Sequence, residues 1–197
     1  MGTSTLSDIP SIVRLAKTGN KESLSLLIEL TQSRFYKFMY GVTGDKYLAD
    51  DMCQEAYIKA LENIGGLKDD NKFVAWLYRT GKNLFFDHVK QKINKSEPLD
   101  DSMINDSATV KVSSTDDVIH INQVLQTLDV EDRVVLLLID MDGHSYSEAA
   151  GLLDLSEDAV RMRLFRARQK FVSSFETSDQ VKSSIKWENE NEFKKGI

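Results

Sequence analysis

Apolar residues recur at the three- and four-residue spacing of amphipathic helices along two stretches of the sequence, residues 12–89 and 118–175. No stretch alternates apolar and polar positions as a half-buried strand would. The pattern therefore predicts an all-α protein made of two small helical domains. We place the first domain at residues 1–92 and the second at residues 118–175.

The segments outside the two domains are polar. Residues 93–117 are rich in Asp, Ser, Lys and Asn, contain Pro98 and lack helical periodicity, which is typical of a flexible acidic linker. A structureless connection of this length is uncommon inside one compact domain, so it favours two domains. Residues 176–197 are predicted to form a loosely ordered, polar C-terminal tail.

Asp142-Gly143 is a turn signal that opens a segment with the signals of two short helices. Ser145 and Glu148 have the spacing of a capping box, in which each side chain satisfies a free backbone N–H at the start of a helix. Ser156 is a second N-cap residue, and two acidic residues follow it where the helix dipole favours negative charge. The segment therefore predicts a helix-turn-helix.

The second of these helices has one narrow apolar side. At about 100° per residue, the buried stripe consists of Val160, Leu164, Ala167 and Phe171. Arg163 and Arg168 lie on its flanks, and the residues that point away from it are Arg161, Met162, Phe165, Arg166 and Gln169. Such an outer face suits a helix that contacts base edges in the major groove of DNA. The alternative interpretation is an ordinary solvated helix with basic side chains.

The net charge of −6 at pH 7 argues at first against a nucleic-acid partner, but the charge is unevenly distributed. Residues 71–95 contain six basic residues and one acidic residue, and residues 156–175 contain five basic and two acidic residues. Residues 97–117, in contrast, contain six acidic residues and one lysine. Two basic islands between acidic blocks are compatible with nucleic-acid binding, because the distribution of charge matters more than its sum.

Two helices of the first domain have distinctive surfaces. One, near residues 50–61, exposes an acidic and glutamine-bearing face that is either simply solvated or a docking surface for a basic partner. The other, from residue 73 to about 92, carries aromatic, basic and amide side chains on one side, namely Trp76, Arg79, Lys82, Asn83, Phe86 and Lys90. Such a surface can stack unpaired bases and hold their backbone. The aromatic rings could equally pack against a neighbouring helix.

The two domains together resemble regions 2 and 4 of bacterial RNA polymerase sigma factors of the extracytoplasmic-function (ECF) group. The resemblance to region 2 rests on LADDMCQEAY at 48–57 and on FVAWLYR at 73–79, followed by Asn83 and Asp87. The resemblance to region 4 rests on RVVLL at 133–137, GHSYSEAA at 143–150 and LFRAR at 164–168. Both sets of motifs in this order, with an acidic linker between them, are specific to this group.

The resemblance implies a role for each surface. Region 2 would dock on the β′ clamp helices of core RNA polymerase through Asp51, Gln54 and Glu55. The next helix would open the −10 promoter element and capture its bases through Phe73, Trp76, Arg79, Lys82 and Asn83. Region 4 would contact the β flap of the polymerase and read the −35 element through Arg161, Met162, Phe165, Arg166 and Arg168. The resemblance also implies an anti-sigma factor as a partner, and no cofactor.

Other classes of protein fit the sequence less well. The three histidines are not at metal-ligand spacing, no Gly-rich phosphate loop occurs, and Ser145 and Ser156 are explained as helix caps, so we expect no enzyme. The single Cys53 excludes an intrachain disulfide and favours a reducing cytoplasm. The sequence contains no run of about 18 apolar residues, so we expect no membrane insertion. Two alternatives stay open, a stand-alone helix-turn-helix transcription regulator and a helical adaptor that binds only proteins.

Overall fold

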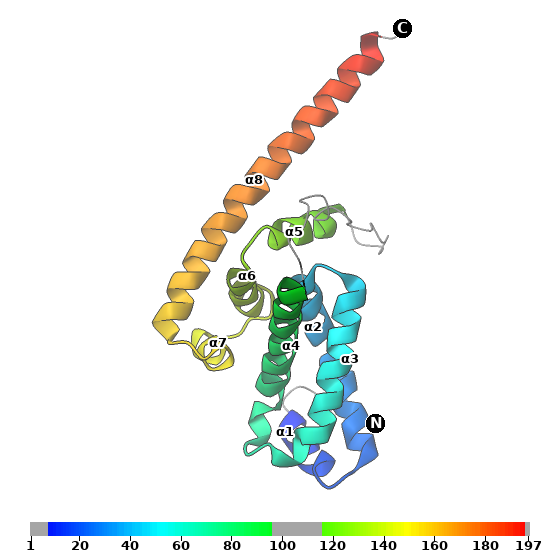
Figure 1. Ribbon diagram of the computed structural model, residues 1–197, viewed down its shortest axis with the longest axis vertical. Coiled ribbons are helices and arrows are strands. Elements are labelled where there is room, and N and C mark those ends of the chain that lie inside the picture. The colour runs from blue at the N-terminus through cyan, green and yellow to red at the C-terminus, as the bar shows by residue number, and fades with distance from the viewer. Residues whose placement is uncertain (1–7, 96–115, 196–197) are drawn as a thin grey trace.

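The computed structural model describes residues 8–95 and 116–195, and the side chains within residues 8–92 and 118–177 (Figure 1). Every regular element in these ranges is a helix or a helical turn, as predicted. Most of the predicted linker, residues 93–117, lies outside the described residues, since α4 ends at Lys95 and α5 begins at Asp116.

The N-terminal part is a helical bundle formed by α1 (Ile9–Ala16), α2 (Lys21–Thr43), α3 (Lys46–Asn63) and α4 (Phe73–Lys95), with the short 3-10 turns η2 (Ile64–Gly66) and η3 (Asp70–Lys72) before α4. Local sequence sets the ends of these helices. Asn20 caps α2 by accepting a hydrogen bond of 2.8 Å from the backbone N–H of Ser23. Gly44, with a φ of 72°, ends α2, and the Asp45 side chain then caps α3.

Aromatic side chains fill the centre of this bundle. The ring of Phe35 on α2 lies 5.7 Å from the ring of Tyr57 on α3 and 5.4 Å from that of Tyr78 on α4, between centroids. Gly81 permits this close packing, because a Cβ atom there would lie 2.7 Å from the Phe35 ring. Contacts with α2 and α3 therefore set the position of α4, and with it the choice of α4 residues that face solvent.

The C-terminal part comprises α5 (Asp116–Gln126), α6 (Val130–Leu136), the π-helical turn η4 (Leu137–Met141), α7 (Tyr146–Leu153) and α8 (Glu157–Lys195). The predicted capping box is confirmed: the Ser145 hydroxyl accepts from the N–H of Glu148 at 3.2 Å, and the Glu148 carboxylate accepts from the N–H of Ser145 at 2.8 Å. Asp154 adopts the left-handed conformation, with a φ of 56°, where α7 ends. The Ser156 hydroxyl accepts from the N–H of Ala159 at 3.2 Å, which confirms the second predicted cap.

The C-terminal segment differs from its prediction. Instead of a loosely ordered tail after residue 175, α8 continues as one helix to Lys195. The segment 176–195 contains no proline or glycine, and Gly196 follows directly after it. Polar composition therefore misled the prediction, because Glu, Lys and Gln are also good helix formers.

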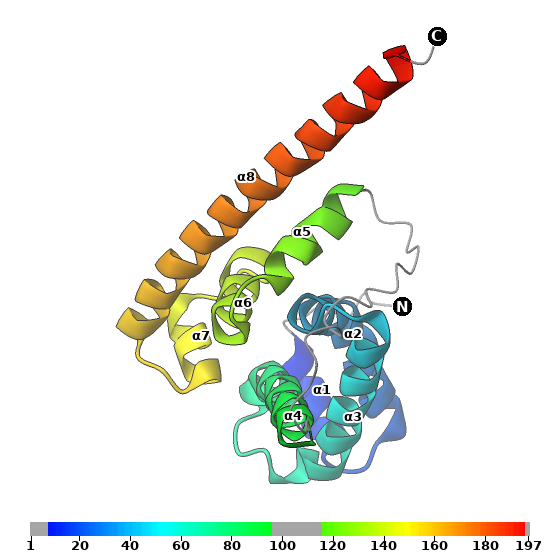
Figure 2. The ribbon, with the colours of Figure 1, turned by 45° about the horizontal axis from the view of Figure 1, so that its top comes forward.

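The two parts pack against each other (Figures 1 and 2). In the N-terminal bundle, α2 contacts α5, α6 and η4, and α4 contacts α7. Buried apolar side chains of both parts form one continuous core, in which Leu137 of η4 lies directly over Gly41 of α2. The two predicted domains thus share an interface that hydrophobic periodicity did not indicate.

Candidate nucleic-acid interface

The orientation predicted for α8 is confirmed. Val160, Leu164 and Ala167 are buried against the C-terminal core, and Phe171 is half-buried. The residues predicted to face away are all exposed, namely Arg161, Met162, Phe165, Arg166 and Gln169. Met162 and Phe165 are 60% and 57% exposed. Large apolar side chains beside arginines on an open face are typical of a contact surface rather than of an inert one.

Acidic side chains of the preceding elements hold several of the basic side chains of α8. The pairs are Arg163 with Glu131, Arg168 with Asp140, and Lys170 with Asp129 and Asp132. Arg168 donates to the Asp140 carboxylate from Nε at 2.9 Å and from Nη2 at 2.5 Å, and this hydrogen bonding raises the pKa of its guanidinium. These contacts orient the flanking cations toward the body of the protein.

Arg161 and Arg166, in contrast, have no acidic partner among the residues that the structure describes. The guanidinium of Arg161 lies 5.1 Å from the centre of the Tyr146 ring, a cation–π arrangement that favours one direction for this long side chain. The outer face of α8 therefore presents two guanidinium groups that no carboxylate of the described residues neutralises, beside apolar side chains.

On α4, the structure corrects one predicted site residue. Phe73 is 2% exposed, and its side chain belongs to the core of the N-terminal bundle. A base could stack on this ring only if the ring left the core, so the prediction that Phe73 contacts DNA is wrong. Trp76, one helical turn later, is half-buried and keeps part of its ring accessible.

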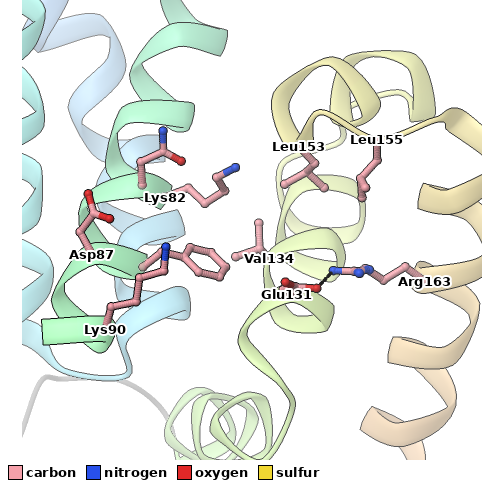
Figure 3. A pocket seen from close by; sticks show the side chains of 10 residues that line it. Lys82, Asp87, Lys90, Glu131, Val134, Leu153, Leu155 and Arg163 are labelled. Carbon is pink, nitrogen blue, oxygen red and sulfur yellow. Dashed lines mark hydrogen bonds and ion pairs between the residues drawn. The ribbon is translucent and has the colours of Figure 1, made fainter. Parts of the chain in front are cut away.

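The remaining predicted residues of α4 lie where the bundle meets the C-terminal part. Arg79 donates from Nη2 to the backbone carbonyl of Gly151 at 2.5 Å and to the Asp154 carboxylate at 2.7 Å. Lys82 and Asn83 line a cavity of about 470 Å³ between α4 and the C-terminal part (Figure 3). The other residues that line it are Phe86, Asp87, Lys90, Glu131, Val134, Leu153, Leu155 and Arg163. Burial lowers the pKa of Lys82.

Sequence reasoning missed a polar cluster between the two parts. Burial and the neighbouring Asp142 carboxylate raise the pKa of Tyr78, and Arg34 donates to the backbone carbonyl of Asp142 at 2.5 Å. The ring of His144 packs edge-on against that of Tyr78, with 5.5 Å between centroids. Burial raises the pKa of Asp142 and lowers the pKa of His144, and the Arg34 charge lowers both values. The sequence marks Asp142 only as a turn residue, so no local signal identified this cluster.

Side chains of the C-terminal part also cap the end of α2. Gln126 donates to the backbone carbonyl of Gly41 at 3.0 Å, and Arg133 donates to that of Val42 at 2.5 Å. The last carbonyls of a helix lack partners within it, and the helix dipole favours a cation at this end. Arg133 is buried, which lowers its pKa to about 10, so it stays charged at neutral pH.

The helix α3, which carries the predicted acidic face, lies on the side of the bundle away from the C-terminal part (Figure 2). Asp51, Gln54 and Glu55 are all exposed, and Glu55 forms an ion pair of 3.0 Å with Lys59 one turn later. Cys53 points into the core, where burial raises the pKa of its thiol to about 12. Nothing within the described part of the chain covers the three predicted docking residues.

The described residues contain neither a candidate metal cluster nor a candidate membrane-spanning helix. Within these ranges, no group of three or more His, Cys, Asp or Glu side chains could hold a metal ion. The same ranges contain no helix whose length and apolar character suffice to cross a membrane.

Comparison with protein families gives two matches, in the order of the two helical parts. Residues 27–93 match the family Sigma-70 region 2, and residues 121–171 match the family Sigma-70, region 4.

Several bacterial proteins are similar along most of their length. The ECF RNA polymerase sigma factor SigM of Bacillus subtilis is 30% identical over 148 residues, which cover 73% of this chain and 90% of the relative. The ECF RNA polymerase sigma factor SigW of the same organism is 24% identical over 173 residues, covering 80% of this chain and 91% of the relative. The RNA polymerase sigma-H factor of Pseudomonas aeruginosa is 27% identical over 171 residues, covering 80% and 89%.

Two solved structures share the fold. CnrH, in complex with the cytosolic domain of CnrY, aligns with a TM-score of 0.65 and 22% identity over 86% of this chain and 97% of its own. The sigma factor RpoE of Bartonella quintana, in complex with the anti-sigma factor NepR, aligns with a TM-score of 0.63 and 18% identity over 77% of this chain and 96% of its own. At these identities the likeness concerns the fold alone.

Proposed function

The chain belongs to the ECF group of RNA polymerase sigma factors, which are not enzymes but direct RNA polymerase to promoters, and from this premise we propose how its surfaces divide that task. We assign region 2 to residues 1–92 and region 4 to residues 118–175, with the linker between them. The assignment of individual residues to polymerase and DNA is our proposal.

For the −35 element, we propose that Arg161 and Arg166 contact base edges in the major groove. The observation that carries this proposal is the arrangement of charges on α8, where acidic neighbours hold the flanking cations and leave these two guanidinium groups facing outward. Arginine recognises guanine by two parallel hydrogen bonds, and apolar groups such as Met162 and Phe165 suit the methyl group of thymine. Arg168, whose position is set by Asp140, would contact phosphate.

For the −10 element, we propose that Trp76, Arg79, Lys82 and Asn83 hold unpaired bases and their backbone. Trp76 supplies a stacking surface, Arg79 and Lys82 supply charge, and Asn83 is exposed with an amide that can recognise a base edge. All four lie on α4, so one rigid element would position them together.

For core polymerase, we propose that Asp51, Gln54 and Glu55 dock on the β′ clamp helices, and that region 4 contacts the β flap. The exposed acidic face of α3 supports the first contact, because it complements a basic partner and α3 lies on the side of the bundle away from α8 (Figure 2). Since two structures of the same fold are complexes with CnrY and with the anti-sigma factor NepR, we also propose an anti-sigma partner for this chain. Its site of action would be the cytoplasm.

Transcription of genomic DNA fragments in vitro by core RNA polymerase, with and without this protein, tests the proposed function. We expect new start sites that share spaced −35 and −10 sequences, and the double variant Arg161→Ala/Arg166→Ala should lose most of them while still binding core polymerase. Sequence-specific binding to duplex DNA without polymerase, together with an absence of new start sites, would instead support the stand-alone regulator. Binding to protein partners alone would support the adaptor.

A further inference from the structure

We infer that Lys17, at the end of α1, is a positioning residue for the −10 contact, because it holds the chain that leads into α4 in one arrangement. We call this chain, residues 67–72, the entry segment. The inference rests on the function proposed for α4. It adds that α1, a helix outside both family matches, sets how well that surface captures an unpaired strand.

One ammonium group bonds the entry segment at two points. Lys17 donates from Nζ to the backbone carbonyl oxygen of Leu67 at 2.5 Å, and it also donates to the Asp70 carboxylate. Because the two acceptors lie three residues apart, the bonds together restrain the chain between them. The side chains of Lys17 and Asp70 are 22% and 16% exposed, so water competes with this pair less than with an ordinary surface ion pair. The bond lowers the pKa of Asp70, which therefore stays charged at neutral pH.

The hydrophobic core fixes the lysine end of this contact. α1 buries four apolar side chains, those of Ile9, Ile12, Val13 and Ala16, and it contacts α2, η3 and α4. Lys17 follows directly, and its backbone N–H donates to the Val13 carbonyl at 2.9 Å. Figure 1 shows α1 at the foot of the bundle, beside the start of α4. The lysine thus reaches from a firmly packed helix to a connection between helices.

Packing does not restrain the residues that precede the entry segment. Gly65 and Gly66 are exposed, and a Cβ atom added at either would meet no atom within 4 Å. Glycine also leaves the backbone more freedom than any other residue. Within the segment, the Leu67 side chain packs on the core. Arg14 adds a bond of 3.4 Å to Asp70, but its side chain is 77% exposed, so we expect this bond to contribute little. Lys17 therefore supplies the main polar restraint.

The entry segment runs directly into the first turn of α4. Phe73, the first residue of α4, is buried, and Trp76 follows one turn later. The segment exposes Lys68, Asn71 and Lys72, so a strand that stacks on Trp76 would pass beside two cations and an amide. A segment that is already ordered in the free protein does not have to be ordered on binding, which favours capture of the strand. Loss of the Lys17 bonds should therefore weaken the −10 step and leave the −35 contact of α8 unchanged.

Three variants of the full chain, each bound to core polymerase, test the inference. Lys17→Met keeps the apolar stem but cannot donate a hydrogen bond, whereas Lys17→Arg keeps the charge and the donors. Lys21→Met is the matched control, because it removes the same charge at the exposed first residue of α2. We expect Lys17→Met to slow open-complex formation by about tenfold, which corresponds to about 1.4 kcal/mol of barrier. Its closed-complex affinity should not change, Lys17→Arg should recover most of the rate, and Lys21→Met should retain all of it.

Hydrogen exchange of the free proteins measures the restraint itself, whether or not promoters open. The amides of residues 65–72 should exchange faster in Lys17→Met than in the natural sequence, Lys17→Arg or Lys21→Met, with unchanged helicity.

Several outcomes would overturn the inference. These are unchanged exchange in Lys17→Met, faster exchange across the whole bundle, opening of promoters by Lys17→Met at the natural rate, equal losses in Lys17→Met and Lys21→Met, and a loss that Lys17→Arg does not recover. If the natural sequence itself fails to open promoters, the function proposed for α4 fails instead, and hydrogen exchange alone decides whether Lys17 orders the entry segment.

Discussion

The division of α8 into a base-reading face and a flanking cation leads to one quantitative prediction. Arg161→Ala should weaken binding of the holoenzyme most strongly at one or two positions of the −35 element. A bidentate contact between arginine and guanine is worth about 1–3 kcal/mol of discrimination, which corresponds to about 5- to 150-fold in affinity. The substitution leaves the buried stripe of α8 untouched, since Arg161 is exposed. Alanine is also a good helix former, so the melting temperature should not fall.

The contact of Arg161 with Tyr146 refines this estimate. The ring lies 5.1 Å from the guanidinium and restricts its direction. An exposed cation–π contact is worth about 0.5–1 kcal/mol. Tyr146→Leu should therefore reproduce the base preference of the natural sequence with an affinity about two- to fivefold lower, because Arg161 remains but is less well oriented.

Arg168→Ala is the matched control on the same helix. Arg168 lies on the flank of α8 rather than on its outer face, and Asp140 fixes its position there, so it should contact phosphate rather than bases. Its loss should weaken binding to all −35 sequences alike and lower the salt dependence by about one ion. The assay is equilibrium binding of each holoenzyme to a panel of single-base −35 substitutions at several salt concentrations. Identical profiles for Arg161→Ala and Arg168→Ala would refute the proposed orientation of the readout.

Three further outcomes are expected. The double variant Gln54→Ala/Glu55→Lys should lose roughly a hundredfold or more in affinity for core polymerase, measured by titration, because it places like charge against a basic partner; unchanged affinity would refute docking through α3. Asn83→Ala should leave closed-complex formation intact and depress open-complex formation in a stopped-flow fluorescence assay, whereas equal loss of both would argue against a −10 role. Lowering the pH from about 7.5 to 6 should loosen the contact between the two parts. Burial lowers the pKa of His144 below its usual 6.5, so the separated state binds the proton more readily. Hydrogen exchange at the interface should become faster at the lower pH in the natural sequence but not in His144→Asn.

Local patterns predicted the features that depend on neighbouring residues. The face of α8 followed from helical spacing, and both caps of the helix-turn-helix followed from Ser145, Glu148 and Ser156. Phe73 was assigned to DNA through the family resemblance, and its burial shows that it lies on the same side of α4 as the core residues Leu77 and Leu84. Its burial is decided by the packing of α4 in the bundle.

The interface between the two parts lay beyond such patterns. Arg34 and Asp142 are 108 residues apart in sequence, and neither stands out in its own helix or turn. No local pattern indicated that Leu137 would pack against Gly41 of α2. Contacts of this kind depend on how whole helices are arranged in space, so local sequence patterns cannot predict them.

The π-helical turn η4 makes the chain unusually sensitive to length at one point. Within five residues it directs Leu137 toward α2 and Asp140 toward Arg168 on α8. A π turn accommodates one residue more than an α-helical turn, so deletion of a single residue here would restore the regular repeat and rotate everything beyond it by about 100°. Either the contact with α2 or the pairing with α8 would then lose its register. Related chains that lack this extra residue would need a different geometry between their two DNA-binding parts.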